Sequence, residues 1–170
     1  MKKWMLLLLL PLLLLFGCSD QEDAQEGTQF WYLNSTYQYG TEASMFACEY
    51  RSIDNADLLP ALANYLSGPT HTDKISPFPK DTAVLSCNTD NGILSVTLSR
   101  EFLQASPAQI SCASICLAKT GTALTGCATV QIFTEDNPDT AYLQLDHGDY
   151  MLYDDVITDV VNTPENEVTQ

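Results

Sequence analysis

The feature that most constrains the fold is a change of hydrophobic period along the chain. Two segments carry apolar residues at helical spacing, whereas the other apolar residues fall in short, bounded runs that are typical of strands. The order is strand, strand, helix, strand, strand, helix, strand. This order predicts an α+β fold, a two-layer sandwich in which two amphipathic helices cover one face of a mixed sheet.

Both helical segments are bounded by residues that favour helix ends. Asp57 is placed to cap the first, and Gly68-Pro69 ends it, because Gly suits the position after a helix and Pro cannot continue one. The second opens at 106–109, where Ser-Pro-Ala-Gln combines a capping box with Pro at the first helical position. Its expected buried stripe consists of Ile110, Ala113, Leu117 and Leu124.

The short apolar runs predict the strands, and one pair of runs predicts a hairpin. Asn91-Gly92 supplies the positive φ angles that a tight turn between two such runs needs. The expected strands are 30–33, 44–51, 82–87, 93–98 and 127–133, and a further hairpin is expected from 141–145 and 150–153.

The N-terminus has the parts of a secretory signal. Lys2 and Lys3 precede an apolar run at 4–16, which is followed by the small residue Gly17. A cysteine directly after the small residue resembles a bacterial lipobox, so Cys18 is expected to be the lipid attachment site and the N-terminus of the mature protein. The apolar run is shorter than the roughly 20 residues of a spanning helix. An uncleaved anchor and ordinary secretion are the alternatives.

Composition divides the chain into four parts. Residues 1–17 form the signal, 18–29 the lipidated cysteine with a disordered acidic linker, 30–155 one folded domain, and 156–170 an acidic tail. The net charge is −15, and removing the two signal lysines lowers it to −17. Such a charge disfavours nucleic acid as a partner. We expect the protein at the extracytoplasmic face of the cell membrane, bound to membrane lipid through its modified cysteine.

Five cysteines remain beside the lipidated one: Cys48, Cys87, Cys112, Cys116 and Cys127. An odd number cannot all pair within one chain. Their neighbours are mostly apolar, so we expect them mainly as buried core residues, with one or two disulfides as the alternative. Cys112 and Cys116 lie four residues apart on the expected helix, which separates their Cβ atoms too widely for a disulfide.

A succession of short motifs resembles the GerMN domain. In chain order the motifs are Tyr32-Leu33-Asn34, Leu66-Ser67-Gly68-Pro69, Ser76-Pro77-Phe78-Pro79-Lys80, Asn91-Gly92-Ile93-Leu94-Ser95-Val96 ahead of Phe102, and Val130-Gln131-Ile132. Each is short, so the resemblance depends on their order and spacing from about residue 30 to 133. The family is named for bacterial sporulation and germination proteins, many of them lipoproteins. Its sporulation members often carry two such domains, whereas this chain has room for one.

The resemblance implies a small α+β domain similar to the ring-building motifs of secretion assemblies. It also implies protein–protein contact outside the membrane rather than catalysis. The expected function is therefore an interaction or scaffold module of the cell envelope, in sporulation or germination. Its expected partners are envelope proteins or further copies of itself.

The residues that carry chemistry do not form a recognisable catalytic set. Both histidines, His71 and His147, fall in expected loops, and no Gly-x-Ser-x-Gly motif occurs. No zinc or EF-hand pattern is present. The acidic turns at 135–139 and 154–155 are expected to be solvated, with weak calcium binding as the alternative. We therefore expect no catalytic residue, metal or cofactor, and an envelope hydrolase with a histidine base is the least favoured interpretation.

An aromatic cluster supports a second functional hypothesis. Trp31, Tyr32, Tyr37 and Tyr39 lie in or beside the first expected strand. Packing in the core and at its rim is the favoured explanation of these residues. Contact with a partner, or with the sugar rings of peptidoglycan or another glycan, is the alternative.

Overall fold

A computed structural model describes residues 26–38, 44–53 and 57–146. Its elements are β1 (Thr28–Asn34), β2 (Phe46–Arg51), α2 (Leu58–Leu66), β3 (Lys74–Ile75), β4 (Val84–Asp90), β5 (Ile93–Leu98), the 3-10 helix η2 (Arg100–Gln104), α3 (Pro107–Thr125), β6 (Thr129–Thr134) and β7 (Leu143–Asp146). The signal, Cys18, Tyr39, His147 and the expected strand at 150–153 lie outside the described residues.

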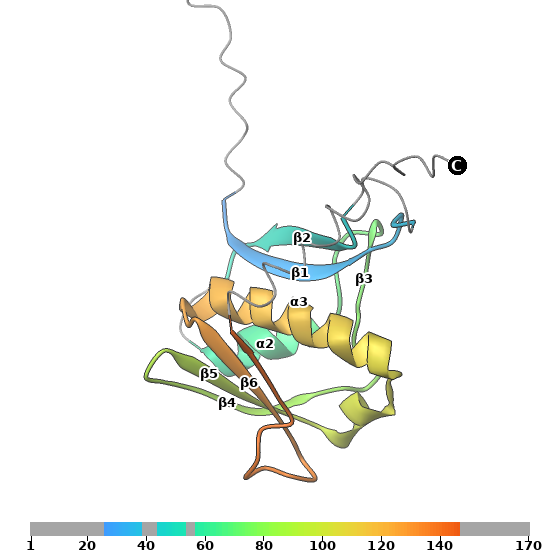
Figure 1. Cartoon of the computed structure of the whole chain (residues 1–170). Coiled ribbons are helices and arrows are strands. Elements are labelled where there is room, and N and C mark those ends of the chain that lie inside the picture. Colours follow the sequence, from blue (N-terminus) through green and yellow to red (C-terminus); the bar gives the residue numbers. More distant parts are fainter. Residues whose placement is uncertain (1–25, 39–43, 54–56, 147–170) are drawn as a thin grey trace, which may run out of the picture.

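The described strands form two sheets, and this arrangement places the helices between them (Figure 1). One sheet has the order β2-β1-β3 and the other the order β4-β5-β6-β7. In the second sheet β5 and β6 are parallel and the other neighbours are antiparallel. The predicted α+β sandwich is confirmed, and the mixed sheet is present, but the first three strands form a separate sheet.

Helix α3 explains why there are two sheets. It contacts β1 on one side and β5, β6 and β7 on the other, while α2 packs against β4. Every residue of α3 from 113 to 121 is buried, whereas the sequence pattern predicts a single buried stripe. A helix that is buried around its circumference needs a partner on more than one side. A small residue also brings it close to the sheet, since a Cβ on Gly121 would lie 2.6 Å from Leu94 Cδ2.

The ends of both helices agree with the sequence in position, though not in every contact. Asp57 occupies the N-cap of α2 without a side-chain hydrogen bond, and Gly68 follows the helix with a φ of +107°. Ser106 Oγ accepts the backbone N–H of Gln109 at 3.3 Å. The Gln109 side chain donates to the Pro77 carbonyl at 3.0 Å instead of closing the capping box.

The edge of β1 that faces away from β2 is closed by side chains of the two helices. The Trp31 amide donates to Thr120 Oγ1 on α3 at 2.9 Å, and its carbonyl accepts from the Tyr65 hydroxyl on α2 at 2.7 Å. Farther along the same edge, Leu33 and Asn34 pair with β3. The backbone groups of this buried strand edge are therefore satisfied without a full neighbouring strand.

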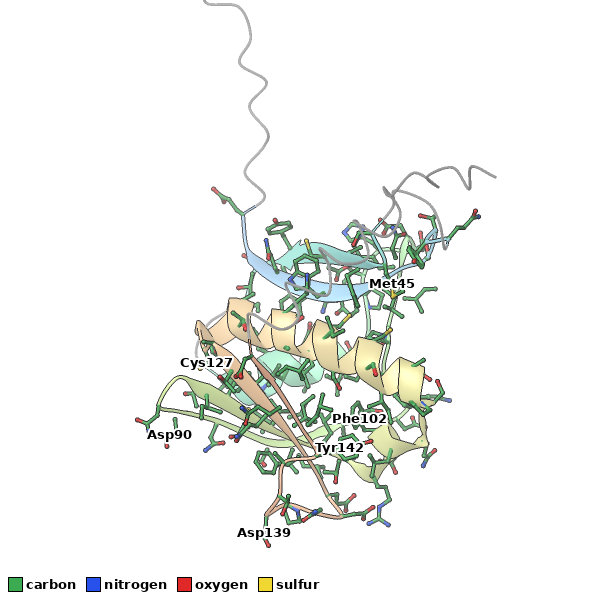
Figure 2. All side chains as sticks on the ribbon, in the orientation of Figure 1. Met45, Asp90, Phe102, Cys127, Asp139 and Tyr142 are labelled. Atoms are coloured by element: carbon green, nitrogen blue, oxygen red, sulfur yellow. The ribbon has the colours of Figure 1, made fainter. Side chains whose placement is uncertain are left out.

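A series of aromatic rings runs from the first sheet through the core to the exposed Tyr142 beside β7. The centroid distances are 5.7 Å from Phe30 to Tyr65, 5.4 Å from Tyr65 to Phe78, 6.5 Å from Phe78 to Phe102 and 6.2 Å from Phe102 to Tyr142. Figure 2 labels the last pair. Contacts of this kind add to the stabilisation from burial alone, so the series ties both sheets to one core.

The β4–β5 hairpin forms as predicted. Asn91 and Gly92 have φ angles of +48° and +78°, which are the values of a type I′ turn. Strand β4 extends farther than expected, to Asp90 at the hairpin tip (Figure 2). The side chains of Cys87 and Thr89 lie on the inner side of the sheet, because these residues pair with the buried Val96 and Leu94.

Four of the five described cysteines pack in or against the core: Cys87, Cys112, Cys116 and Cys127. Cys116 and Cys127 are buried, and Cys48, Cys87 and Cys112 are half-buried. Burial raises the pKa of the Cys87 and Cys112 thiols. The prediction of core residues is therefore confirmed for Cys116 and Cys127, and no disulfide joins any of these five in the described part of the chain.

Candidate functional site

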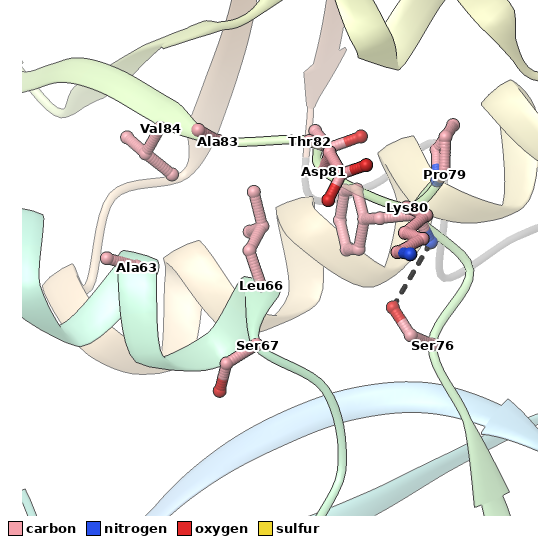
Figure 3. A pocket seen from close by; sticks show the side chains of 11 residues that line it. Ala63, Leu66, Ser67, Ser76, Pro79, Lys80, Asp81, Thr82, Ala83 and Val84 are labelled. Atoms are coloured by element: carbon pink, nitrogen blue, oxygen red, sulfur yellow. Dashed lines mark hydrogen bonds between the residues drawn. The ribbon is translucent and has the colours of Figure 1, made fainter.

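A hollow of about 450 Å³ lies between the C-terminal end of α2 and the segment that leads into β4 (Figure 3). Its volume falls in the range of ordinary ligand sites. We call it, together with the adjoining outer edge of β4, the α2–β4 groove. The residues that line the hollow are Ala63, Leu66, Ser67, Ser76, Phe78, Pro79, Lys80, Asp81, Thr82, Ala83 and Val84.

One wall of the groove is an apolar stripe of α2. Ala63 and Leu66 line the hollow. Leu59 lies one turn before Ala63 on the same side of the helix and is 41% exposed. Leu62, one turn before Leu66, lies on the core side of the same stripe and is fully buried. The apolar face of the helix therefore extends from the core outward to the groove.

The opposite wall is the segment 76–84, whose backbone is fixed by hydrogen bonds and by the burial of two of its side chains. Ser76 Oγ accepts the Phe78 amide at 3.3 Å, and Gln109 Nε2 on α3 donates to the Pro77 carbonyl. Pro77 and Phe78 are buried. The motif Ser76-Pro77-Phe78-Pro79-Lys80 thus shapes the groove by fixing the backbone of its wall.

The rim of the hollow carries opposite charges and an unsatisfied hydroxyl. Lys80 and Asp81 are exposed, and Asp81 has a φ of +68°, which is uncommon for a residue other than glycine. Thr82 Oγ1 is buried and makes no hydrogen bond to a described residue. The backbone amide of Thr82 donates to the Pro79 carbonyl at 3.3 Å.

The wall continues directly into β4, which is an edge strand. Among the described residues β4 pairs only with β5. In an antiparallel pair the backbone bonds alternate along the strand, and the tight turn makes Asp90 and Ile93 a bonded pair. Cys87 and Thr89 therefore direct their backbone N–H and C=O groups outward. A bulge between Val84 and Ser86 leaves Leu85 47% exposed.

A second hollow of about 270 Å³ lies at the other end of β4 and α2. Thr89 and Leu58 are among its lining residues, as is Leu124 of α3. Helix α2 thus runs beside β4 with its N-terminal end near Thr89 and its C-terminal end near Val84.

A buried polar cluster anchors α2 to the first sheet on the side away from the groove. Arg51 forms an ion pair with Glu49. Its guanidinium also donates to Tyr32 Oη and the Gly68 carbonyl, both at 2.7 Å, and to Asn64 Oδ1 at 2.6 Å. A cation at the C-terminal end of a helix interacts favourably with the helix dipole. The cluster therefore stabilises the C-terminal end of α2.

The cluster also determines the protonation of its members. Burial opposes ionisation of Glu49, but the Thr70 amide and the Arg51 guanidinium outweigh it, so the pKa of Glu49 is lowered. Burial raises the pKa of Tyr32 and of Tyr65. Glu49 is accordingly a carboxylate, and the two phenols are neutral hydrogen-bond donors.

Of the predicted aromatic set, the three described residues Trp31, Tyr32 and Tyr37 are not all exposed on one face. Tyr32 is fully buried, so it belongs to the core. Trp31 is half-buried, and Lys119 Nζ lies 4.1 Å from the centre of its ring. Tyr37 is half-buried in the turn after β1. Glycan contact through Trp31 and Tyr37 stays a prediction.

No catalytic arrangement forms around His71 in the described part of the chain. His71 lies in the exposed loop between α2 and β3. No hydrogen bond links its ring to a described hydroxyl or thiol, although its proximity contributes to lowering the pKa of Asp73, for which the hydrogen bond from Lys74 is the largest cause. Within residues 26–38, 44–53 and 57–146, no group of three His, Cys, Asp or Glu side chains is placed to hold a metal.

None of the helices within residues 26–38, 44–53 and 57–146 has the length and apolar character needed to cross a membrane.

The geometry of the α2–β4 groove suits binding. The groove offers an apolar wall, a polar rim and unpaired strand backbone, which are the elements of sites that bind extended peptides. The groove was not predicted from the sequence, because the exposure of Leu59 and Leu85 becomes apparent only when α2 and β4 are in place.

Comparison with known proteins agrees with the fold. The model of the Germane family, described as sporulation and spore germination, matches residues 32–140. The tandem GerMN domains of the sporulation protein GerM from Bacillus subtilis superpose with a TM-score of 0.51 at 13% identity, over 70% of this chain and 43% of that one. This chain thus spans less than half of the tandem structure.

A candidate lipoprotein from Clostridium perfringens superposes with a TM-score of 0.47 at 17% identity, over 72% of this chain and 90% of that one. No curated protein matches the chain.

Proposed function

Because the chain belongs to the Germane family of sporulation and spore germination proteins, we propose that it is an interaction module of the cell envelope. In this proposal Cys18 carries the lipid that holds the protein at the extracytoplasmic face of the membrane, and residues 19–29 separate the anchor from the folded domain. The domain binds envelope proteins and catalyses no reaction.

The α2–β4 groove is the observation that carries this proposal. It combines an apolar hollow of about 450 Å³ with the unpaired edge of β4. Exposed apolar surface next to unsatisfied backbone is costly for a protein that has no partner. An interaction function gives this surface a use, whereas the isolated loop position of His71 gives no support to hydrolysis.

Chemical crosslinking in native membranes tests the proposal. The full-length protein is crosslinked in cells, purified through a C-terminal tag and analysed by mass spectrometry. We expect reproducible crosslinks from the folded domain to a small set of envelope proteins. Capture of wall fragments alone would favour the glycan hypothesis, and the absence of any crosslink from the domain would contradict the proposed function.

A further inference from the structure

We propose that the α2–β4 groove binds an extended, basic peptide segment of a partner protein, which adds as a strand to the outer edge of β4. This inference rests on the proposed interaction function and specifies the chemistry of the partner. The occupant follows from the backbone of β4, the apolar side of α2 and the charge around the groove.

The backbone of β4 is ready to pair. Cys87 and Thr89 direct their N–H and C=O groups away from β5, and no described residue bonds to these groups. Edge strands are usually protected by Lys, Pro or charged residues, but between Val84 and Asp90 the sequence is Leu-Ser-Cys-Asn-Thr. The bulge at Leu85 interrupts the strand, so pairing is expected from Ser86 to Asp90.

The side of α2 next to the groove selects the side chains of the added strand. Every second residue of a strand points to the same face, and on the inner face these residues would meet Leu59, Ala63 and Leu66. A side chain at the Val84 end enters the hollow, where the buried Thr82 hydroxyl is without a described partner. The peptide is therefore expected to be apolar at alternate positions and small or polar between them.

The charge around the groove selects a basic segment. The charged residues that line the two hollows are Lys80, Asp81 and Asp57, and Asp90 ends the strand. The described residues hold 11 Asp and Glu against 5 Lys and Arg, a net charge of −6, and the whole chain carries −15. Such a surface attracts cationic partners and repels anionic ones.

The negative charge also disfavours the two occupants that this protein itself could supply, which are a second copy and its own C-terminal segment. A second copy would bring together two domains whose described residues each carry a net charge of −6. The C-terminal residues 147–170 contain six acidic residues and neither Lys nor Arg. A basic segment from another protein is the occupant that both the charge and the apolar wall favour.

The first test is amide hydrogen exchange by NMR on the full-length protein in detergent micelles, with the probe peptide acetyl-Lys-Val-Thr-Val-Ser-Val-Lys-amide. At saturation we expect exchange of the Cys87 and Thr89 amides to slow by at least about tenfold, since each amide gains a hydrogen bond. The amides of Ser86 and Asn88 already bond to β5 and serve as internal controls. Unchanged exchange at Cys87 and Thr89 with bound peptide would overturn strand addition.

Two N-methylated isomers of the peptide provide a matched comparison. Each is methylated on three alternate amides, at peptide positions 2, 4 and 6 or at positions 3, 5 and 7, so the isomers have the same charge and apolar area. One isomer loses the amides that face β4 and should bind at least about tenfold more weakly than the other. Equal binding of both isomers would contradict the proposed pairing. A probe with Glu in place of both Lys should bind more weakly at low salt, and equal affinity would contradict the charge argument.

Two variants in which an exposed alanine is replaced by phenylalanine test the groove wall without altering the core. Ala63 on α2 and Ala123 on α3 are both exposed helical residues. Ala63→Phe fills the groove and should weaken peptide binding by about tenfold or more, whereas Ala123→Phe should leave it unchanged. Equal effects of both variants would contradict binding in the groove.

The results of peptide binding and of membrane crosslinking together distinguish failure of this inference from failure of the proposed function. If no peptide binds but membrane crosslinking still captures envelope proteins through the domain, strand addition is wrong and the interaction function stands. If slowed exchange at Cys87 and Thr89 appears without peptide as protein concentration rises, the occupant is a second copy and the basic-peptide proposal is wrong. If both peptide binding and crosslinking are absent, both proposals are wrong.

Discussion

The backbone amide of Trp31 on β1 donates a hydrogen bond to Thr120 Oγ1 on α3 at 2.9 Å, which joins positions 89 residues apart. The Tyr65 hydroxyl satisfies the carbonyl of the same residue. The edge of β1 that faces away from β2 is thus closed by side chains of two helices. The outer edge of β4 has no such closure among the described residues, and this contrast between two strand edges underlies the proposed binding site.

The Trp31–Thr120 bond predicts the effect of an isosteric change. Thr120→Val removes the acceptor and leaves a buried N–H unsatisfied, so the free energy of unfolding should fall by about 1–3 kcal/mol. Urea unfolding followed by circular dichroism measures the change. Thr120→Ser retains the oxygen and is the control. Equal losses in both variants would show that packing of the methyl group matters rather than the hydrogen bond.

Glu49 predicts a specific dependence of stability on pH. Despite its burial, contacts with Thr70 and Arg51 lower its pKa below the ordinary value of 4.5. A carboxyl with a lowered folded pKa contributes stability that is complete above its unfolded pKa and is lost as pH falls through the folded value. The free energy of unfolding should therefore decrease below about pH 4.5.

Glu49→Gln isolates this contribution. The carboxyls of Asp73, Glu101 and Glu135 also have lowered pKa values, and they titrate in both proteins. The variant should be less stable at pH 7 but should lose less stability between pH 5 and pH 3 than the wild type. Parallel stability curves for the two proteins would contradict the assigned role of Glu49.

Gly121 predicts a coupled pair of substitutions. Gly121→Ala improves helix propensity by about 1 kcal/mol, but the new Cβ would lie 2.6 Å from Leu94 Cδ2. Overpacking of this kind costs about 1–3 kcal/mol, so the single variant should be neutral or destabilised. In a Leu94→Ala background the same change should stabilise the protein. A double-mutant cycle by urea unfolding that gives no coupling would contradict the close approach of α3 to β5.

Cys18 predicts the mode of membrane attachment. Cys18→Ser removes the acceptor of the lipid, so the protein should leave the membrane fraction and lose the mass of the attached lipid. Fractionation and intact mass spectrometry measure both changes. Cys48→Ser is the matched control and should remain in the membrane. Retention of Cys18→Ser in the membrane would show that an uncleaved apolar segment anchors the chain.

Local sequence signals predicted the elements well because they act over a few residues. Asn91-Gly92 specifies a tight turn through its positive φ angles, and Gly68-Pro69 ends α2 in the same local way. The division into two sheets depends on contacts between distant residues, such as Trp31 with Thr120. The burial of α3 on all sides has no periodic signature, because small and polar residues such as Ser114 fill it.

The candidate site was harder to predict from the sequence than the fold. Ala63 and Val84 form opposite walls of one groove, yet they belong to separate elements and neither has reactive chemistry. The aromatic run at 30–32 was the more visible signal, but Tyr32 is committed to the core through its contacts with Tyr65 and Arg51. Exposed apolar residues at an edge strand become informative only when the neighbouring helix is in place.

Site-specific photocrosslinking in native membranes tests the central claim most directly. Benzoylphenylalanine is introduced in place of Leu85 on β4 and, in a separate protein, in place of Gln144 on β7, an exposed residue at the other end of the same sheet. We predict that the probe at position 85 crosslinks an envelope protein through a basic, extended segment and that the probe at 144 does not. Equal labelling from both positions, or none from position 85 in folded, membrane-bound protein, would contradict the claim that the α2–β4 groove is the interaction site.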